Sequence, residues 1–269
     1  MNKKELIAKS DFVITLGTML SNNKEAYRDS IIESIAKTNA KFVYMHPIDN
    51  IDIKLYYTQF IKYEVGSEEG VCALLLDAFV KNSDENIKAY IDNLDLGYIS
   101  AESSAGEEEF EEAYESSCDA SFKTLIIGDD IIEHNRVENI VKILAVIKKY
   151  SDLNLVVLND DLEQKINSCE NFDLEDIEDL KSYNGTLLYR LIDEEDNDIL
   201  SCSQSFANIA KVQDGDEVFI NFAGEKTKRV LKVDDKLNGT VSIAKSSNCD
   251  SELFKNYRYK QVKIEKVDA

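Results

Sequence analysis

Two glycines, Gly17 and Gly128, stand where a nucleotide phosphate would bind if this chain bound one. Each follows a short apolar run (residues 12–16 and 124–127) and precedes a stretch with helical periodicity. Glycine lets a chain turn sharply from a strand into a helix, and the N-terminus of that helix attracts phosphate. A dinucleotide-binding turn needs three glycines, however, and each of these turns has one. Two aspartates directly after Gly128 would repel a phosphate, so we predict no working dinucleotide site.

The pattern places His46 beside these turns, and histidine is a residue type that can act in catalysis. It ends the strand-like run 41–45, and open parallel sheets bind their ligands at the carboxyl ends of the strands. Gly17, Thr18, His46 and Gly128 therefore define a vestigial pocket. The sequence offers His46 no nucleophile partner and contains no Gly-x-Ser-x-Gly elbow, and the other histidine, at position 134, is expected to begin a helix. We predict no catalytic residue.

Metal or cluster binding has no support in the spacing of the five cysteines. They lie 46, 51, 33 and 47 positions apart, at Cys72, Cys118, Cys169, Cys202 and Cys249. Zinc and iron–sulfur ligands need short spacings. The acidic run at 193–198 lacks the glycine and terminal glutamate of a calcium loop and is expected to be a solvated turn. An odd number of cysteines without an export signal indicates a reducing compartment, so we expect a cytoplasmic protein whose chain holds no metal and no cofactor.

The net charge of −21 is concentrated in two segments. Residues 101–120 contain eight acidic residues and no lysine or arginine, and residues 159–200 contain fourteen acidic and three basic residues. Direct binding of nucleic acid is disfavoured, because neutralising phosphates requires clustered lysine and arginine. Each acidic segment is either a solvated linker or helix face, or a docking surface for a basic partner. No apolar run reaches the roughly 18 residues of a membrane span, so we expect no direct membrane insertion.

Two strand–turn–helix–strand units predict an α/β fold. Thirty positions separate Phe12 from Phe42, and 31 separate Thr124 from Leu155. Apolar runs with little alternation are typical of strands covered on both faces, so we expect an open, mostly parallel sheet with helices on both faces. Helical periodicity predicts helices at about 22–38, 67–79, 107–116 and 135–150. Asn22 is expected to cap the first of these helices, and the third is expected to be exposed.

The pattern changes after residue 184 to short strands separated by Asp-Gly and Asn-Gly turns, which is typical of a small barrel. Residues 186–192 and 199–202 are expected to form a hairpin across the polar turn between them. We place the domain boundary near residue 200. The α/β domain then covers residues 1–200, with an acidic insert at about 101–120, and a small C-terminal β-barrel covers residues 201–269.

Three segments together resemble one family, the molybdopterin-dependent oxidoreductases. They are residues 10–18 with 40–47, residues 65–71 with 125–129 and 134–140, and residues 206–218 with 238–241. The first is similar to the family's "Ala-Asp-x-Val-x-x-x-Gly-Thr … Gly-Ala-Lys-x-x-x-x-Asp-Pro" unit. The second is similar to the G subunit of bacterial NADH-quinone oxidoreductase in particular. The third is similar to the C-terminal barrel that elsewhere in the family holds the pterin dinucleotide.

The chain also departs from the family's pattern. The family's aspartate before the proline, a dinucleotide contact, is replaced by His46, and the cysteine cluster motif and the molybdenum-ligand region have no counterpart. The G subunit's molybdopterin-like region is regarded as having lost its cofactor. The resemblance therefore implies a structural, cofactor-free part of NADH-quinone oxidoreductase (respiratory complex I), which transfers electrons from NADH to quinone. We expect the chain to be either the C-terminal part of a longer polypeptide or a shortened relative.

The resemblance also implies partners and a location. The partners would be the other peripheral-arm subunits and the iron–sulfur domains of the parent subunit, at the cytoplasmic face of the inner membrane. Two other functions stay open. The chain is alternatively part of a molybdopterin-dependent oxidoreductase that still binds a pterin guanine dinucleotide near Gly17, Thr18, His46 and Gly128, or an acidic protein-interaction module.

Overall fold

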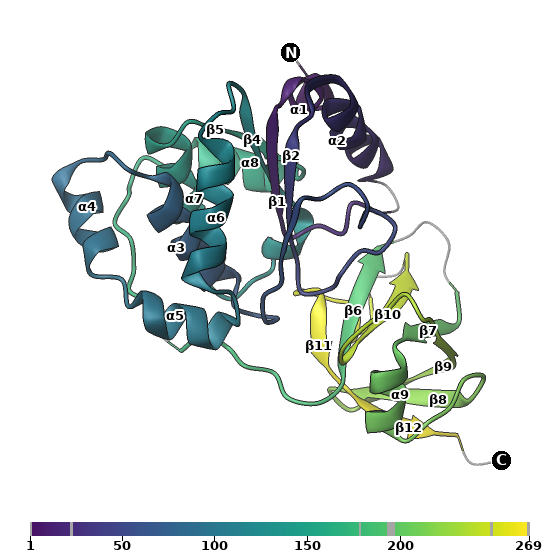
Figure 1. The fold of residues 1–269 in the computed structure, drawn as a ribbon. Helices are drawn as coiled ribbons and strands as arrows, with labels where there is room; N and C mark the ends of the chain where they lie inside the picture. Colours follow the sequence, from purple (N-terminus) through teal and green to yellow (C-terminus); the bar gives the residue numbers. More distant parts are fainter. Residues whose placement is uncertain (1, 22–23, 178, 193–196, 248–249, 268–269) are drawn as a thin grey trace. The chain divides into compact units, whose positions relative to one another are not determined.

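A five-stranded parallel sheet and a seven-stranded barrel-like sheet form two separate units of this chain, as the sequence pattern predicts. A computed structural model describes residues 2–21, 24–177, 179–192, 197–247 and 250–267 (Figure 1). The first unit comprises Met1–Pro47 and Asp52–Ser182, and the second comprises Ile48–Ile51 and Tyr183–Ala269.

The sheet of the first unit has the strand order β3-β2-β1-β4-β5, with every neighbouring pair parallel. Its strands are β1 (Phe12–Leu16), β2 (Lys41–Met45), β3 (Gln59–Ile61), β4 (Lys123–Ile127) and β5 (Leu153–Val157). The chain leaves β1 towards β2 on one side and later returns to place β4 on the other side of β1. Such a reversal is a topological switch point, and it lies here between β1 and β4.

Helices cover both faces of this sheet (Figure 1). One face packs against α1 (Lys3–Lys9) and α2 (Glu25–Thr38), and the other against α3 (Glu68–Phe79) and α7 (Val137–Tyr150). Successive residues of β1 alternate between these two layers. Val13 lies in a cluster with α1 and α2, and Phe12 and Ile14 lie in the larger cluster with α3 and α7. The apolar runs therefore form strands buried on both faces, which confirms the predicted α/β class.

The described part of this unit also contains the α-helices α4 (Glu85–Asp92), α5 (Leu96–Ser103), α6 (Glu107–Ser117) and α8 (Asp160–Asn167). The prediction that the acidic helix near residues 107–116 is exposed was wrong on one side, because α6 buries Phe110 and Ala113 in the main core. Its glutamates occupy the outer face. The predicted cap of α2 at Asn22 lies outside the described residues. Among the described residues no helix has the length and apolar character needed to cross a membrane.

Residues 169–182, which we name the strap, follow α8 and contain neither helix nor strand among their described residues. The strap packs apolar side chains onto the core: Leu180 is buried, and Phe172, Leu174 and Ile177 are half-buried against it. Leu180 lies beside Gly70 of α3, where an added Cβ would come within 2.7 Å of its Cδ1 atom. The strap is therefore part of the packed structure of the first unit.

The second unit contains a sheet of strand order β11-β6-β10-β7-β9-β8-β12 and the helix α9 (Gln204–Ala210). Its strands are β6 (Leu187–Ile192), β7 (Ile199–Cys202), β8 (Glu217–Phe222), β9 (Glu225–Val233), β10 (Val241–Ser246), β11 (Tyr259–Gln261) and β12 (Lys263–Lys266). The strands at the two ends of this order, β11 and β12, are consecutive in the chain. The sheet is therefore nearly closed on itself, which agrees with the predicted C-terminal barrel.

Two details of this unit differ from the sequence-based expectation. The predicted hairpin of β6 and β7 does not form, because β10 lies between them and pairs parallel with β6 and antiparallel with β7. The polar turn at 193–196 lies outside the described residues. The division between the units falls at residues 182 and 183, whereas the sequence placed a boundary near residue 200. It falls earlier because β6 and β7 both belong to the second sheet.

Candidate functional site

The four residues of the predicted pocket all belong to the carboxyl edge of the parallel sheet. Gly17 and Thr18 follow β1, His46 follows β2, and Gly128 follows β4. This edge includes the switch point between β1 and β4, where open α/β sheets bind their ligands. The structure therefore places all four predicted residues at the same edge of the sheet.

Gly17 and Gly128 bring two backbone segments into direct contact. The Gly128 N–H donates to the carbonyl oxygen of Leu16 at 2.8 Å, and the Asp130 N–H donates to the carbonyl oxygen of Gly17 at 3.1 Å. A Cβ atom on Gly128 would lie 2.0 Å from that Gly17 oxygen, and a Cβ on Gly17 would lie 3.1 Å from the side chain of Ile131. Each glycine thus makes room for another part of the chain. A phosphate would have to displace those atoms to reach either turn.

His46 is buried and pairs with Asp130, also buried, which lies in the short 3-10 helix η2 (Asp129–Ile131). Its Nε2 atom lies 3.1 Å from the Asp130 Oδ2 atom, and its ring stacks on Tyr44 with 5.8 Å between the ring centroids. The neighbouring Asp129 forms an ion pair with Lys24, at 3.0 Å between Nζ and Oδ2. The aspartates that follow β4 are therefore engaged with the chain itself at this edge.

Thr18 is buried, and its hydroxyl oxygen accepts the N–H of Leu20 at 3.1 Å. Leu20 has a left-handed backbone conformation, with φ of 54°. The hydroxyl therefore holds the turn after β1, in the manner of a local side-chain cap. This use leaves Thr18 as a structural residue of the turn.

The geometry of this edge does not fit a pterin dinucleotide. A pyrophosphate needs backbone N–H groups of a helix N-terminus that it can approach closely. Here the Gly17 carbonyl, Ile131 and the carboxylate of Asp130 occupy the space around the two turns. Within the described ranges, no group of three or more His, Cys, Asp or Glu side chains converges in a way that could hold a metal ion. In this structure these residues take part in packing and internal hydrogen bonding.

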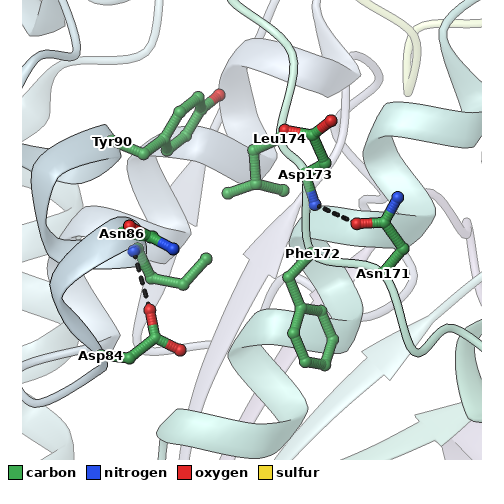
Figure 2. Close-up of a pocket in the computed structure, with 8 residues that line it drawn as sticks. Asp84, Asn86, Tyr90, Asn171, Phe172, Asp173 and Leu174 are labelled. Carbon is green, nitrogen blue, oxygen red and sulfur yellow. Dashed lines mark hydrogen bonds between the residues drawn. The ribbon is translucent and has the colours of Figure 1, made fainter.

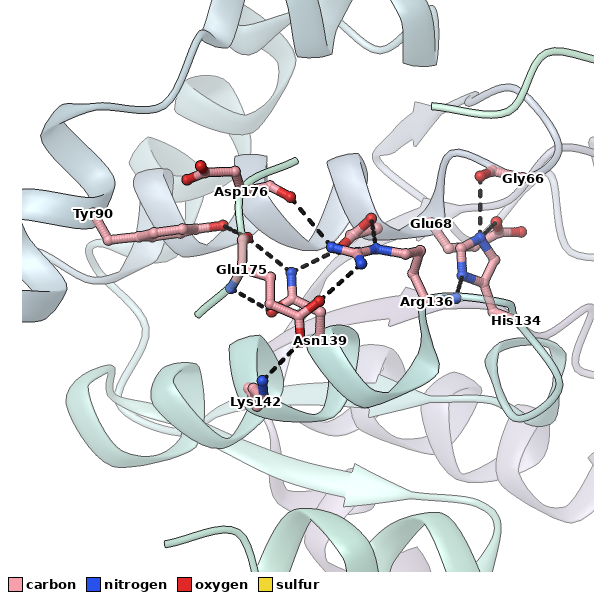
Figure 3. Close-up of polar contacts among 10 residues, drawn as sticks. Gly66, Glu68, Tyr90, His134, Arg136, Asn139, Lys142, Glu175 and Asp176 are labelled. Carbon is pink, nitrogen blue, oxygen red and sulfur yellow. Dashed lines mark hydrogen bonds and ion pairs between the residues drawn. The ribbon is translucent and has the colours of Figure 1, made fainter. Parts of the chain in front are cut away.

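A second polar arrangement joins α3, α7 and the strap, and the sequence reasoning missed it (Figure 3). At its centre is Glu69, 1% exposed, whose two carboxylate oxygens each lie 3.1 Å from the Arg136 Nε atom. The Asn139 amide donates to the same carboxylate at 2.6 Å. Arg136 also pairs with Glu175 of the strap, at 2.8 Å from its Nη1 atom, and Lys142 pairs with Glu175 at 2.9 Å. We name Glu69, Arg136, Asn139, Lys142 and Glu175 the strap cluster.

Backbone hydrogen bonds fix the strap at the same place. The Glu175 N–H donates to the Asn139 side-chain oxygen at 2.9 Å, and the Glu175 carbonyl accepts from the Asn139 amide at 3.1 Å. The Tyr90 hydroxyl of α4 donates to that carbonyl at 3.0 Å. The Lys142 ammonium, and then Arg136, lower the pKa of the Glu175 carboxyl below its ordinary value. Glu175 is therefore ionised at neutral pH, and its charge and backbone together tie the strap to α7.

His134 lies next to this cluster and is held neutral. Its Nδ1 atom accepts the Arg136 N–H at 3.1 Å, so the ring proton belongs on Nε2, which lies 3.1 Å from the Gly66 carbonyl oxygen. The Glu68 carboxylate lies 3.4 Å from the same Nε2 atom. Burial is the largest effect on His134 and lowers its pKa below the ordinary value of 6.5. His134 therefore joins the loop before α3 to the loop before α7.

The sequence did contain a signal for this arrangement. Residues 65–71 and 134–140 were two of the three parts of one family-like pattern, and the structure brings them together through contacts from Gly66, Glu68 and Glu69 to His134 and Arg136. Two consecutive glutamates at the start of an otherwise apolar helix were a further sign, because buried carboxylates require partners. Their partners could not be identified from sequence, since 67 positions separate Glu69 from Arg136.

Comparison with known proteins gives a likeness of fold alone. No protein-family model matches the chain, and no curated protein matches it by sequence. Among solved structures, the chain is similar to acetylene hydratase from Pelobacter acetylenicus, with a TM-score of 0.58 and 7% sequence identity. The alignment covers 98% of this chain and 78% of that chain. The fold of this chain is therefore similar to that of a solved protein.

Proposed function

We propose that this chain is a cofactor-free, structural member of the molybdopterin-oxidoreductase fold, and that it serves as the molybdopterin-like region of the G subunit of NADH-quinone oxidoreductase. Acetylene hydratase, the structural neighbour, is a molybdopterin-family enzyme, which supports the fold-level part of this proposal. The assignment to the G subunit is supported by the resemblance of residues 65–71 and 134–140, whose side chains contact each other in the structure.

One observation carries the cofactor-free part of the proposal. The carboxyl edge of the parallel sheet, where a ligand would bind, is occupied by the contact between Gly17 and Gly128 and by the buried pair of His46 and Asp130. The chain's own atoms fill the space beside both glycine turns, which a phosphate would need to approach closely. Electron transfer would then belong to the parent complex, with this chain packing beside iron–sulfur domains and other peripheral-arm subunits. That role places the chain at the cytoplasmic face of the inner membrane.

The test is a pull-down of the tagged chain from solubilised membranes of its native host, with the bound proteins identified by mass spectrometry. We expect the NADH-oxidising subunits to be recovered in amounts that scale with the bait. Molybdenum, measured in the same purified chain by mass spectrometry of the metal, is expected at far below one atom per chain. Stoichiometric molybdenum, or recovery of other proteins without the NADH-oxidising subunits, would contradict the proposal.

The second candidate is a molybdopterin-dependent oxidoreductase that still binds a pterin guanine dinucleotide. The likeness to acetylene hydratase favours it, and the occupied sheet edge disfavours it. It predicts a saturable guanine-nucleotide titration that His46→Ala weakens, measured by calorimetry. An acidic interaction module is the third candidate, and a chain that folds alone yet never associates with respiratory subunits would favour it.

A further inference from the structure

A cleft of about 510 Å³ lies between α4 and the strap (Figure 2). Residues of α4 form one wall and residues of the strap form the other. The apolar lining residues are Ile87, Tyr90, Phe172 and Leu174, and the polar ones are Asp84, Asn86, Asn171 and Asp173. All eight residues belong to the first unit. The volume falls within the range of about 300–1,000 Å³ in which proteins commonly bind small groups.

Internal hydrogen bonds fix both walls of this cleft. Tyr90 links them directly, because it belongs to α4 and its hydroxyl donates to the Glu175 carbonyl of the strap at 3.0 Å. Asp84 caps α4 by accepting the Ile87 N–H at 3.0 Å, and the Asp173 N–H donates to the Asn171 side-chain oxygen at 2.9 Å. The cleft is therefore preformed, and a ligand would not have to order either wall.

The chemistry of the lining favours a cation. The eight lining residues include two carboxylates and no lysine or arginine. The Tyr150 hydroxyl donates to Asp84, and this hydrogen bond lowers the pKa of Asp84 below its ordinary value, which keeps it ionised. The Phe172 ring already attracts a cation of this chain, since the Lys149 Nζ atom lies 4.6 Å from its centroid. Aromatic rings beside carboxylates form a favourable environment for guanidinium and ammonium groups.

We propose that this cleft binds an arginine or lysine side chain presented by a basic segment of a partner protein. The identity of the ligand as a protein segment rests on the proposed function, in which the chain is a structural subunit. Exposed acidic residues of the strap on either side of the cleft, Glu170 and Asp176, extend the same charge along the path of such a segment. The cleft would fix one basic side chain, and the strap would attract its neighbours.

The experiment is a titration of the full isotope-labelled chain with Nα-acetyl-arginine methylamide, followed by NMR chemical shifts of the backbone amides. The uncharged citrulline analogue, which has the same shape, is the control probe. We expect saturable shifts confined to residues 84–90 and 171–174, with a dissociation constant in the millimolar range, and no saturation with citrulline. Shifts spread over all the acidic surfaces, or equal saturation by both probes, would overturn the proposal.

Matched variants separate the cleft from the general negative charge. Asp173→Asn is expected to weaken binding about threefold, since it removes an exposed partner of the cation. Asp161→Asn makes the same change of charge on α8, outside the cleft, and is expected to leave binding within experimental error. Lys149→Gln is expected to tighten binding by removing a competing ammonium from Phe172. Equal effects of Asp173→Asn and Asp161→Asn would overturn the assignment of the site to the cleft.

A quantitative pull-down with the same two variants tests the partner. Asp173→Asn is expected to recover less of the NADH-oxidising subunits than Asp161→Asn does, and equal recovery would overturn the assignment to a partner segment. The two experiments fail independently. Absence of those subunits with the unaltered chain contradicts the proposed function, whereas the titration tests the cleft by itself.

Discussion

Replacing Arg136 with methionine tests whether the strap cluster holds the strap against α3 and α7. Methionine keeps much of the aliphatic side chain and removes the guanidinium group. The Glu69 carboxylate, 1% exposed, then keeps the Asn139 amide and loses two contacts of 3.1 Å from Arg136. On the other side of Arg136, Glu175 loses a contact of 2.8 Å and keeps Lys142.

The expected loss of stability follows from the different exposure of Glu69 and Arg136. Breaking a fully buried ion pair costs about 3–5 kcal/mol, and breaking an exposed one costs about 0–1 kcal/mol. Glu69 is buried, whereas the Arg136 side chain is 34% exposed and screened by solvent. We therefore expect Arg136→Met to lower the free energy of unfolding by about 2–3 kcal/mol, between those limits. For a unit of this size, that corresponds to a fall of roughly 5–10 °C in the melting temperature.

Thermal unfolding followed by circular dichroism measures this change, and tyrosine fluorescence provides a second probe because the chain has 13 tyrosines and no tryptophan. Hydrogen exchange measured by mass spectrometry shows where in the chain stability is lost, and we expect faster exchange in residues 169–182. Glu69→Met combined with Arg136→Met serves as the control. The double variant is expected to be more stable than Arg136→Met alone, since no buried charge is left without its partner. A loss below about 0.5 kcal/mol for Arg136→Met, typical of an ordinary surface substitution, would refute the reasoning.

Three further predictions concern the glycine contacts and His134. Gly128→Ala is expected to destabilise the fold by about 3 kcal/mol or more, because its Cβ would meet backbone atoms at 2.0 Å. Gly97→Ala is the control. Its added Cβ has its nearest contact at 3.6 Å, so it is expected to be neutral or slightly stabilising in the same melting experiment. Gly70→Ala is expected to displace Leu180, whose Cδ1 atom is 2.7 Å from the added Cβ, and to speed hydrogen exchange in the strap; unchanged exchange there would contradict the described packing. Because the folded-state pKa of His134 is lowered below 6.5, the unfolded chain binds the proton more tightly, so stability is expected to fall as pH drops below 6.5, by up to about 1.4 kcal/mol per pH unit. His134→Gln should remove that pH dependence between pH 7 and about pH 5, above the range in which carboxylates titrate. The free energy of unfolding is measured by urea unfolding at each pH, and an unchanged slope of this free energy against pH would contradict the assignment to His134.

The sequence predicted the strands and crossover helices of the first unit well, because local patterns of apolar residues are enough to identify them. Apolar runs such as residues 12–16 and 124–127 identify strands that are buried on both faces, and the spacing between them identifies the crossover helices. The same signals placed Gly17, His46 and Gly128 at one edge of one sheet, as the structure has them. These inferences depend on local patterns and on the general handedness and order of parallel units.

The features that sequence could not provide depend on pairing between distant residues. The β6–β7 hairpin was predicted from a short polar turn, but β10 pairs with both strands and separates them. The aspartates after Gly128 were expected to oppose phosphate, and nothing in the sequence indicated that Asp130 pairs with His46, 84 positions away. The strap is rich in acidic residues, and the sequence pattern did not indicate that it packs on the core. Its half-buried apolar residues are spaced irregularly and match neither a helix nor a strand.

The closure of the second sheet has a consequence for the order of events during synthesis. Among the described residues, β11 pairs with β6 alone and β12 pairs with β8 alone, so residues 259–266 supply both final pairings of this sheet. A nascent chain that has emerged only to residue 258 would present β6 and β8 as two unpaired edges, which are templates for association with other chains. Ribosome stalling or premature termination shortly before residue 259 is thus expected to yield aggregation-prone products, whereas the parallel sheet of the first unit has all five of its strands by residue 157.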